Sequence, residues 1–379
     1  MLKSLVTSLL IAFFVLDSYA QNQLEIICAS RIDTSDSEMR MVFDAYSEYF
    51  YDKPERVYDV KNWNTDEMEK HMLFDFSYQH LFSNVLKGRE DKFKLYVMSI
   101  EPIYGTEKYQ IKALLQWGEG LKTNRSISLI HKITVKFENE DLVFENNFVE
   151  MTKNWKREKI GRITYCYHPD YRFDTLLASK ANHFIDSVYN LLQLDLPKTE
   201  INYTLARDFD EFANLLGFDY YSFQFTSGIT STWDSDIKTM KGPFHAHELV
   251  HLITKYKSDF ILTEGLADYF GTKLTDNKGY LSHQKKLIDH IGESKSSLKD
   301  YFEGSIPWMG FNHKYTLGAL LCEYINNEYG LSKLIELLKI DTQKEYTLLG
   351  GIEKVTNLKE EEFFIEFGSF LCNLEFESL

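Results

Sequence analysis

The sequence predicts an α+β protein, and three observations lead to that fold class. One amphipathic helix near the N-terminus is followed by consecutive runs of β-forming residues, and the pattern turns mainly helical after residue 168. No internal repeat or low-complexity tract interrupts the 379 residues. Strands gathered in one part of a chain and helices in another are typical of an α+β architecture. A chain of this length also suffices for two domains with cores of their own.

Residues 1–20 are typical of a secretory signal peptide. Lys3 precedes an apolar run from Leu5 to Leu16, and the small residues Ser18 and Ala20 suit cleavage after Ala20. The run is too short to span a bilayer, and no later stretch reaches the ~20 apolar residues of a transmembrane helix. We therefore expect a soluble protein that is secreted or periplasmic and has no stable membrane insertion. An uncleaved anchor helix is the alternative.

Composition narrows the possible partners. The formal net charge of −15 argues against nucleic acid and against anionic membrane surfaces, since binding to either needs clustered Lys and Arg. The four cysteines lack a CxxC spacing, so they form neither a disulfide scaffold nor a thiolate zinc site. Two interpretations of them remain open. Cys322 could pair with Cys372, or Cys28 with Cys166; alternatively, all four are isolated small hydrophobes.

Residues 21–168 are expected to form an accessory α+β domain. Apolar residues recur at helical spacing over 35–51, which predicts a helix. Five later segments are rich in β-formers and predict a curved antiparallel sheet: Phe93–Ile100, Tyr109–Trp117, Ser126–Phe137, Val143–Met151 and Ile160–Tyr167. A helix followed by such strands looks like a cystatin or NTF2-type fold. Because no catalytic constellation occurs here, we expect this domain to support the other one or to engage substrate.

Residues 169–379 are expected to form a second, mainly helical domain. A helix is predicted over Leu176–Leu192, and a short strand over Ile201–Ala206 precedes a helix capped by Asp208 or Asp210. The segment Thr226–Trp233 indicates a further strand, so the helices are accompanied by a small edge sheet. The acidic run at 360–362 fits an exposed first turn of the last helix.

The chemistry is concentrated in the pentapeptide HELVH at 247–251, an HExxH arrangement. On a helix, residues four apart lie one above the other, so the imidazoles of His247 and His251 can converge on one ion. Glu248 then flanks the open coordination position, where its carboxylate can take a proton from water. Pro243 suits the first turn of this helix. His245 is not expected to be a ligand, since its two-residue offset from His247 turns it to another side of the helix.

A third metal ligand follows further along the chain. Glu264 can complete a His₂Glu site that leaves the fourth position for water, and Thr263 suits the N-cap of the helix that carries it. Asp268 lies one turn beyond Glu264 on the same face, where it could accept the free ring N–H of His247 or His251. Such a carboxylate fixes the tautomer of the histidine and raises its basicity as a ligand.

With these residues in place, the chain resembles the gluzincin metallopeptidases of the peptidase MA clan, which includes thermolysin-like and M1-type enzymes. It is most similar to small bacterial peptidase-MA-like secreted proteins. The resemblance covers residues 200–340 and implies a zincin-like catalytic domain, with Zn²⁺ bound by His247, His251 and Glu264 and with Glu248 as general base. The segment Tyr315–Leu321, followed by Tyr329 and Gly330, is similar to the clan's tyrosine–glycine helix. This likeness gives Tyr315 the role of oxyanion donor, for which His313 is a rival.

Two departures limit what the resemblance implies. The chain has no GxMEN motif, which in M1-type enzymes binds the free amino terminus of the substrate, and the step from His251 to Glu264 is shorter than in the large aminopeptidases. Aminopeptidase specificity is therefore not expected. The predicted function is that of a secreted zinc metallopeptidase acting on a peptide or protein substrate. Two other functions stay open: a non-catalytic secreted binding protein that retains a structural zinc site, and a zinc hydrolase of non-peptide bonds.

Overall fold

The computed structural model describes residues 24–52, 62–64, 75–118, 126–138, 141–194, 200–222, 227–232, 235–254, 258–303, 306 and 311–374. Over these ranges the protein is α+β, with two sheets and a helical C-terminal region, which confirms the predicted fold class. The signal peptide predicted over residues 1–20 lies outside the described residues. Within the ranges above, no helix combines the length and the apolar character that crossing a membrane requires.

The chain forms two compact units, each described here by itself. The first comprises Met1–Trp155 with Ala206–Phe225, and the second comprises Lys156–Leu205 with Thr226–Leu379. This division differs from the single boundary predicted between residues 168 and 169. The hairpin that ends at Tyr167 belongs to the second unit because its last strand pairs in parallel with Ile201–Leu205. The segment 206–225 returns to the first unit because Phe218–Tyr221 pairs with that unit's sheet.

The first unit is built on one sheet with the strand order β1-β2-β3-β4-β5, in which β9 also pairs with β4. Strand β1 runs parallel to β2, and the other neighbours are antiparallel. The strands are β1 Glu25–Cys28, β2 Phe93–Pro102, β3 Lys108–Trp117, β4 Ser126–Glu138, β5 Asp141–Glu145 and β9 Phe218–Tyr221. The helical elements are α2 Ser37–Tyr51, the π-helix η2 Gln79–Leu86, the short 3₁₀ turn η3 Glu90–Lys92, α4 Phe148–Thr152 and α6 Phe209–Leu215.

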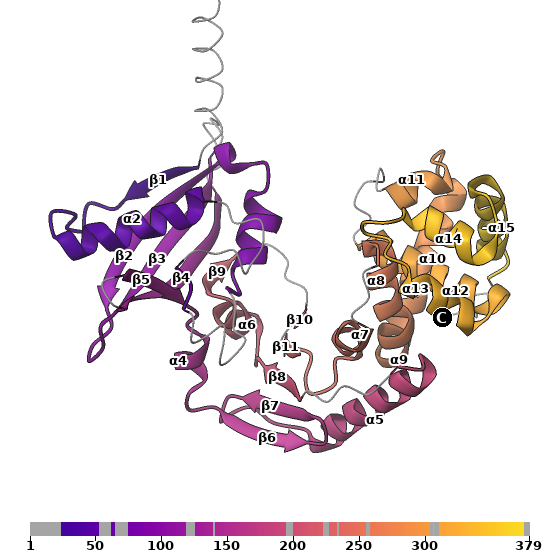
Figure 1. The fold of residues 1–379 in the computed structure, drawn as a ribbon, viewed down its shortest axis with the longest axis horizontal. Helices are drawn as coiled ribbons and strands as arrows, with labels where there is room; N and C mark the ends of the chain where they lie inside the picture. The colour runs from indigo at the N-terminus through magenta and orange to yellow at the C-terminus, as the bar shows by residue number, and fades with distance from the viewer. Residues whose placement is uncertain are drawn as a thin grey trace, which may run out of the picture. The chain divides into compact units, whose positions relative to one another are not determined.

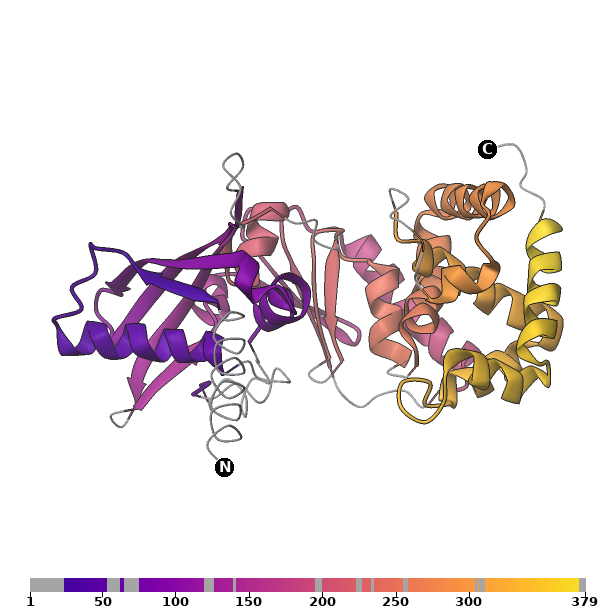
Figure 2. The ribbon, with the colours of Figure 1, turned by 90° about the horizontal axis from the view of Figure 1, so that it is seen from above.

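Helix α2 covers this sheet, as the two ribbon views show (Figure 1, Figure 2). Asp36 caps the helix, because its side chain accepts from the Met39 amide at 2.9 Å. Its buried face contributes Val42, Tyr46 and Phe50 to the core. The predicted helix over 35–51 and the predicted strands that became β2, β3 and β4 are confirmed. The strand predicted over Val143–Met151 is wrong beyond Glu145, since the chain turns there into α4.

A polar network lies inside the first unit. The Tyr49 hydroxyl donates to Asp75 at 2.5 Å, and the Ser77 hydroxyl donates to the other oxygen of the same carboxylate at 2.6 Å. The His131 ring links Ser77 at 3.1 Å to the Tyr46 hydroxyl at 2.8 Å. All five side chains are buried. Burial lowers the pKa of His131 to about 3 and raises the pKa of Asp75.

The second unit joins a sheet of strand order β10-β11-β8-β7-β6 to a set of helices (Figure 1). The strands are β6 Lys156–Ile160, β7 Ile163–Tyr167, β8 Ile201–Leu205, β10 Gly228–Ser231 and β11 Asp236–Thr239. The helices are α5 Thr175–Leu191, α7 Ala246–Thr254, α8 Phe260–Ala267, the π-helical segment η4 Asp268–Thr272, α9 Lys273–Thr275, α10 Asn277–Glu293, α11 Leu298–Glu303, α12 His313–Tyr329, α13 Leu331–Lys339, α14 Leu348–Thr356 and α15 Glu360–Cys372. Asp208, one of the two predicted caps, caps α6 of the first unit.

The two edges of this sheet differ. Strand β6 is one edge and carries Lys156, Arg157 and Lys159, and charged residues on an edge discourage pairing with another strand. Strand β10 is the other edge and has the uncharged sequence Gly-Ile-Thr-Ser. It packs against α7, the helix that carries the HELVH pentapeptide. The uncharged edge is therefore the one beside the candidate site.

All four cysteines are free thiols in the structure. Cys166 and Cys322 are buried, and burial raises the pKa of both thiols. This state matches the interpretation as small hydrophobes and shows neither of the two disulfide pairings left open above.

Candidate metal centre

Helix α7 presents the two histidines. Its buried side chains, Leu249, Val250, Leu252 and Ile253, join the core of the second unit. The helix begins at Ala246, later than the start that Pro243 suggested, because the first helical hydrogen bond runs from the Leu249 amide to the His245 carbonyl at 3.2 Å. With the apolar side fixed against the core, His247 and His251 share the opposite side.

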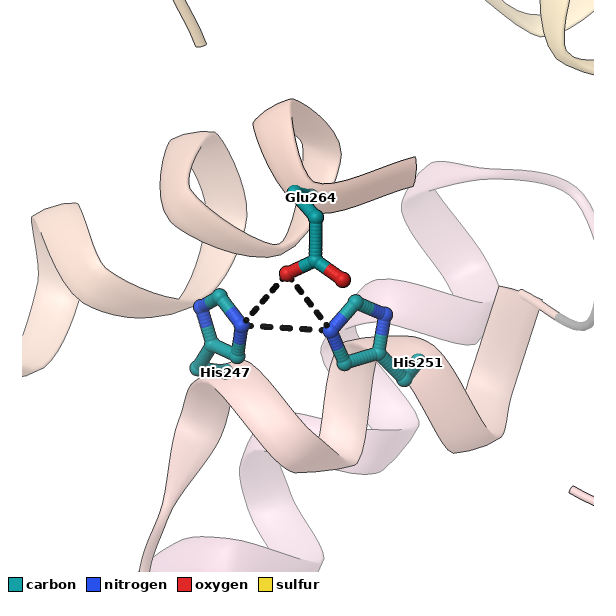
Figure 3. Close-up of side chains that lie close together, drawn as sticks. All are labelled: His247, His251 and Glu264. Carbon is teal, nitrogen blue, oxygen red and sulfur yellow. Dashed lines mark hydrogen bonds and ion pairs between the residues drawn. The ribbon is translucent and has the colours of Figure 1, made fainter. Parts of the chain in front are cut away.

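Helix α8 brings the third residue. It begins at Phe260 with Asp259 as its cap, since the Asp259 carboxylate accepts from the Ile261 amide at 2.8 Å. The predicted N-cap at Thr263 is therefore wrong, and the helix is one turn longer at its start. Glu264 lies in the body of α8, and its carboxylate points toward both imidazoles of α7 (Figure 3).

The three side chains converge on one point. The Nε2 atoms of His247 and His251 are 3.1 Å apart, and each lies 3.3 Å from Oε2 of Glu264 (Figure 3). In tetrahedral zinc sites the metal lies ~2.0–2.1 Å from its ligands, which separates the ligands by about 3.3 Å. The observed triangle therefore fits a metal ion that caps it. Each side chain exposes 13–15% of its surface, so the cluster is sheltered but still reached by solvent. His247, His251 and Glu264 could together hold a metal ion.

Asp268 lies behind His247, as expected. The Nδ1 atom of His247 is 3.1 Å from Oδ1 of Asp268 and 3.3 Å from the Thr272 hydroxyl, which itself donates to the same oxygen at 2.7 Å. In the neutral imidazole that a metal would bind, the proton lies on Nδ1 and is held by this acceptor, so the lone pair of Nε2 faces the cluster. His251 has no such contact with Asp268 among the described residues.

The electrostatics of the cluster favour a positive charge at its centre. Burial lowers the pKa of His247, but hydrogen bonds with Asp268 and Glu264 outweigh it and raise that pKa to about 10. Burial opposes ionisation of Glu264, but its hydrogen bonds with His247 and His251 bring the pKa of Glu264 down to about 2. The negative charge of these carboxylates would also attract a divalent cation, which would displace the proton from His247 on binding.

Glu248 follows His247 on α7 and faces strand β10. It is 6% exposed, and its carboxylate accepts from the Thr230 hydroxyl at 2.7 Å. The same hydroxyl lies 3.0 Å from the Glu248 main-chain oxygen. Glu248 is not part of the triangle of ligand atoms. The residue expected to act as a base is therefore beside the cluster and held by a group that the sequence analysis did not single out.

Tyr315 lies in the first turn of α12 and reaches the same site. Its ring stacks on the His247 imidazole with centroids 5.9 Å apart and meets Phe260 edge-on at 5.7 Å. Burial and the charge of Glu264 raise the pKa of its hydroxyl well above the ordinary value, so the hydroxyl keeps its proton and can donate. The rival His313 contacts Tyr301 with centroids 6.1 Å apart, and its imidazole is buried there.

A close contact between glycines sets the distance from α12 to α8. A Cβ atom on Gly265 would lie 2.1 Å from the carbonyl carbon of Gly318, and a Cβ on Gly318 would lie 1.9 Å from the Ile261 carbonyl oxygen. Only glycine fits at both positions, which lets the two backbones touch. Because Glu264 precedes one glycine and Tyr315 lies one turn before the other, this contact brings both side chains to one site.

His245 is turned away from the cluster. Its Nδ1 atom is 2.9 Å from the Thr239 hydroxyl, and burial lowers its pKa to about 4. It is not among the residues that could hold a metal ion, as expected from its offset. Thr230 and Thr272, by contrast, touch the site and were not foreseen. Threonine is common on strands and helices, so nothing in the local sequence distinguishes these two.

Searches against models of protein families and against curated proteins return no match.

Proposed function

We propose that this chain is a secreted zinc metallopeptidase of the gluzincin type. The observation that carries the proposal is the triangle of His247, His251 and Glu264, whose sides of 3.1, 3.3 and 3.3 Å fit a tetrahedral metal with one open position. Export rests on the N-terminal sequence, which is typical of a signal peptide.

Zinc is the metal that this donor set favours. Two neutral imidazoles and one carboxylate form a borderline ligand set, whereas calcium and magnesium prefer sites made of oxygen atoms alone. Three protein ligands with a fourth position left open are typical of catalytic rather than structural zinc sites. The carboxylate behind His247 is the kind of partner that catalytic zinc histidines usually have.

The residues around the triangle suit hydrolysis. When bound, zinc supplies a Lewis acid that polarises the scissile carbonyl and activates water. Glu248 takes a proton from the attacking water and passes it to the leaving nitrogen, a role that needs a buried carboxylate beside the metal. Tyr315 keeps its proton and donates to the oxyanion that develops on the substrate. Neither Glu248 nor Tyr315 is needed merely to hold a metal.

A peptide is the substrate that the surroundings favour. Strand β10 pairs with β11 on one side, and its other side forms the edge of the sheet next to α7. An extended peptide can add to such an edge through its main-chain hydrogen bonds, which brings a peptide bond to the site. Because the chain has no GxMEN motif, we do not propose that the enzyme is an aminopeptidase.

The test compares Glu248→Gln with the wild type in peptide-library cleavage and zinc analysis of the same preparations. The variant should keep its zinc and lose peptide hydrolysis by ~10²-fold or more, since a positioned general base contributes that much. Glu366→Gln is the control, because it neutralises a carboxylate of α15 that accepts only from Tyr324 and Tyr329 among the described residues.

Three results would contradict the proposal in different ways. A zinc-loaded wild type that cleaves no peptide would favour a zinc-retaining binding protein. Activity on esters or amides without peptide cleavage would favour a hydrolase of non-peptide bonds. A fully active Glu248→Gln variant would remove Glu248 from the mechanism.

A further inference from the structure

Strand β10 presents a specific surface to Glu248. Alternate residues of a strand share a face, and Gly228 and Thr230 are the two that face α7. A Cβ atom on Gly228 would lie 2.8 Å from Cγ of Glu248 and 2.7 Å from Nδ1 of His245. Glycine therefore makes room for the Glu248 side chain, and the next residue on that face binds its carboxylate.

We infer that Thr230 is a positioning residue for Glu248 and that it sets the orientation of the carboxylate in the reaction. The inference rests on the proposed function, because it assigns a partner to the general base. It goes beyond that proposal by placing part of the catalytic apparatus on the edge strand rather than on the metal-binding helices.

The geometry gives a physical reason for this role. A glutamate side chain has three rotatable bonds, and a buried carboxylate with no fixed donor would sample several orientations. The Thr230 hydroxyl donates to Oε2 of Glu248 at 2.7 Å, and a hydrogen bond to a charged acceptor is about twice as strong as a neutral one. One carboxylate oxygen is thereby held against β10, which leaves the other for the proton of the attacking water.

The same hydroxyl has a second acceptor. The main-chain oxygen of Glu248 is 3.0 Å from Oγ1 of Thr230, and a hydroxyl has a single proton to donate. While Glu248 is ionised, the carboxylate is the stronger acceptor. Both acceptors belong to Glu248, so the Thr230 hydroxyl ties the side chain and the backbone of one residue to the strand.

A purely structural role would be different. The contact with the main-chain oxygen alone would tie β10 to α7, so its loss would lower stability or weaken substrate binding at the strand. Positioning of Glu248 instead affects the chemical step. A change in kcat at constant KM and constant zinc content separates the two roles.

The experiment measures kcat, KM, zinc content and the thermal unfolding midpoint for zinc-loaded wild type, Thr230→Val and Thr230→Ser. Valine keeps the shape of threonine and removes the hydroxyl, and serine keeps the hydroxyl. We expect Thr230→Val to lower kcat by ~10–100-fold with KM nearly unchanged, as for a lost hydrogen bond to a charged group. Thr230→Ser should recover most of kcat. Thr356→Val is the control, because it removes a threonine hydroxyl that donates to a carbonyl within α14.

The outcomes separate the two proposals. An unchanged kcat in Thr230→Val, with an active wild type, would overturn the role of Thr230 and leave the metallopeptidase proposal intact. A loss that appears as higher KM or as missing zinc would also overturn it. If Thr230→Val does not fold, Thr230→Ala takes its place with the same expectation. A zinc-loaded wild type without peptide cleavage would instead refute the proposed function, and the role of Thr230 with it.

Discussion

Replacement of Asp268 by asparagine is expected to weaken zinc binding without changing the fold. The amide oxygen of the introduced side chain can still accept from Nδ1 of His247, which is 3.1 Å from Oδ1 of Asp268 in the structure, and from the Thr272 hydroxyl, at 2.7 Å. What the variant loses is the negative charge of the acceptor. Hydrogen bonds to charged groups contribute ~1.5–3 kcal/mol and neutral ones about 1 kcal/mol, so the loss is about 0.5–2 kcal/mol. That difference corresponds to ~2–30-fold weaker binding, which overlaps the ~10–100-fold losses seen for such partners of zinc ligands.

Zinc affinity in this comparison is measured by competition with a chromophoric chelator at fixed pH. Asp276→Asn is the matched control, since Asp276 caps α10 through the Gly279 amide at 3.1 Å and carries the same charge. The control should bind zinc as the wild type does. Equal zinc affinities for Asp268→Asn and Asp276→Asn would refute the reasoning, because Asp268 would then be no more than another nearby acid.

Three further expectations concern Tyr315, the contact between α8 and α12, and the first unit. Tyr315→Phe should keep zinc and lower kcat by ~10²–10³-fold, as for other lost oxyanion donors, and a kcat near the wild-type value in steady-state assays would exclude that role. Gly318→Ala should destabilise the second unit by about 1–3 kcal/mol in thermal unfolding, since its Cβ would lie 1.9 Å from the Ile261 oxygen. Gly368→Ala, whose Cβ meets nothing within 4 Å, should be neutral or stabilising, and equal effects of the two would show that the α8–α12 contact is loose. Burial holds the pKa of His131 at about 3 in the folded first unit, so between pH 7 and 5 the unfolded chain gains a proton that the folded unit does not. The free energy of unfolding should therefore fall by about 2 kcal/mol over that interval, as measured by hydrogen exchange in β4. His131→Gln should lose less stability than the wild type over the same interval. An equal loss would contradict the assignment of this pH dependence to His131.

The metal triad could be foreseen because its geometry is mostly local. His247 and His251 are four residues apart on one helix, so their convergence follows from helical periodicity. Glu264 lies on the next helix, and the short connection leaves it little freedom. Asp268 follows from the same periodicity, one turn past Glu264. These four residues could be assigned to the site without knowledge of the rest of the fold.

What could not be foreseen depends on long-range packing. The pairing of β7 with β8 brings together strands separated by the whole of α5, and it moves the unit boundary away from the change in composition near residue 168. The contact between Gly265 and Gly318 joins two helices that are distant in sequence. Thr230 reaches Glu248 only because β10 lies at the edge of the sheet beside α7. Residues of this kind carry no local signal.

The N-cap of α8 was predicted wrongly because two local sequence signals compete there. Asp259 and Thr263 are both good N-cap residues, and the apolar residues between them could belong to the helix or to the segment before it. The structure starts α8 after Asp259, because this adds a turn whose Ile261 and Leu262 are buried in the core.

Zinc at the His247, His251 and Glu264 site is the condition on which the proposed function depends most directly. The decisive measurement is elemental analysis of the protein, purified without chelators, beside His251→Ala and the control His183→Ala, which changes an exposed histidine of α5. We predict about one zinc per chain in the wild type and the control, as for a mononuclear site, and almost none in His251→Ala. Absence of metal from the wild type, or full zinc content in His251→Ala, would contradict the assignment of the site.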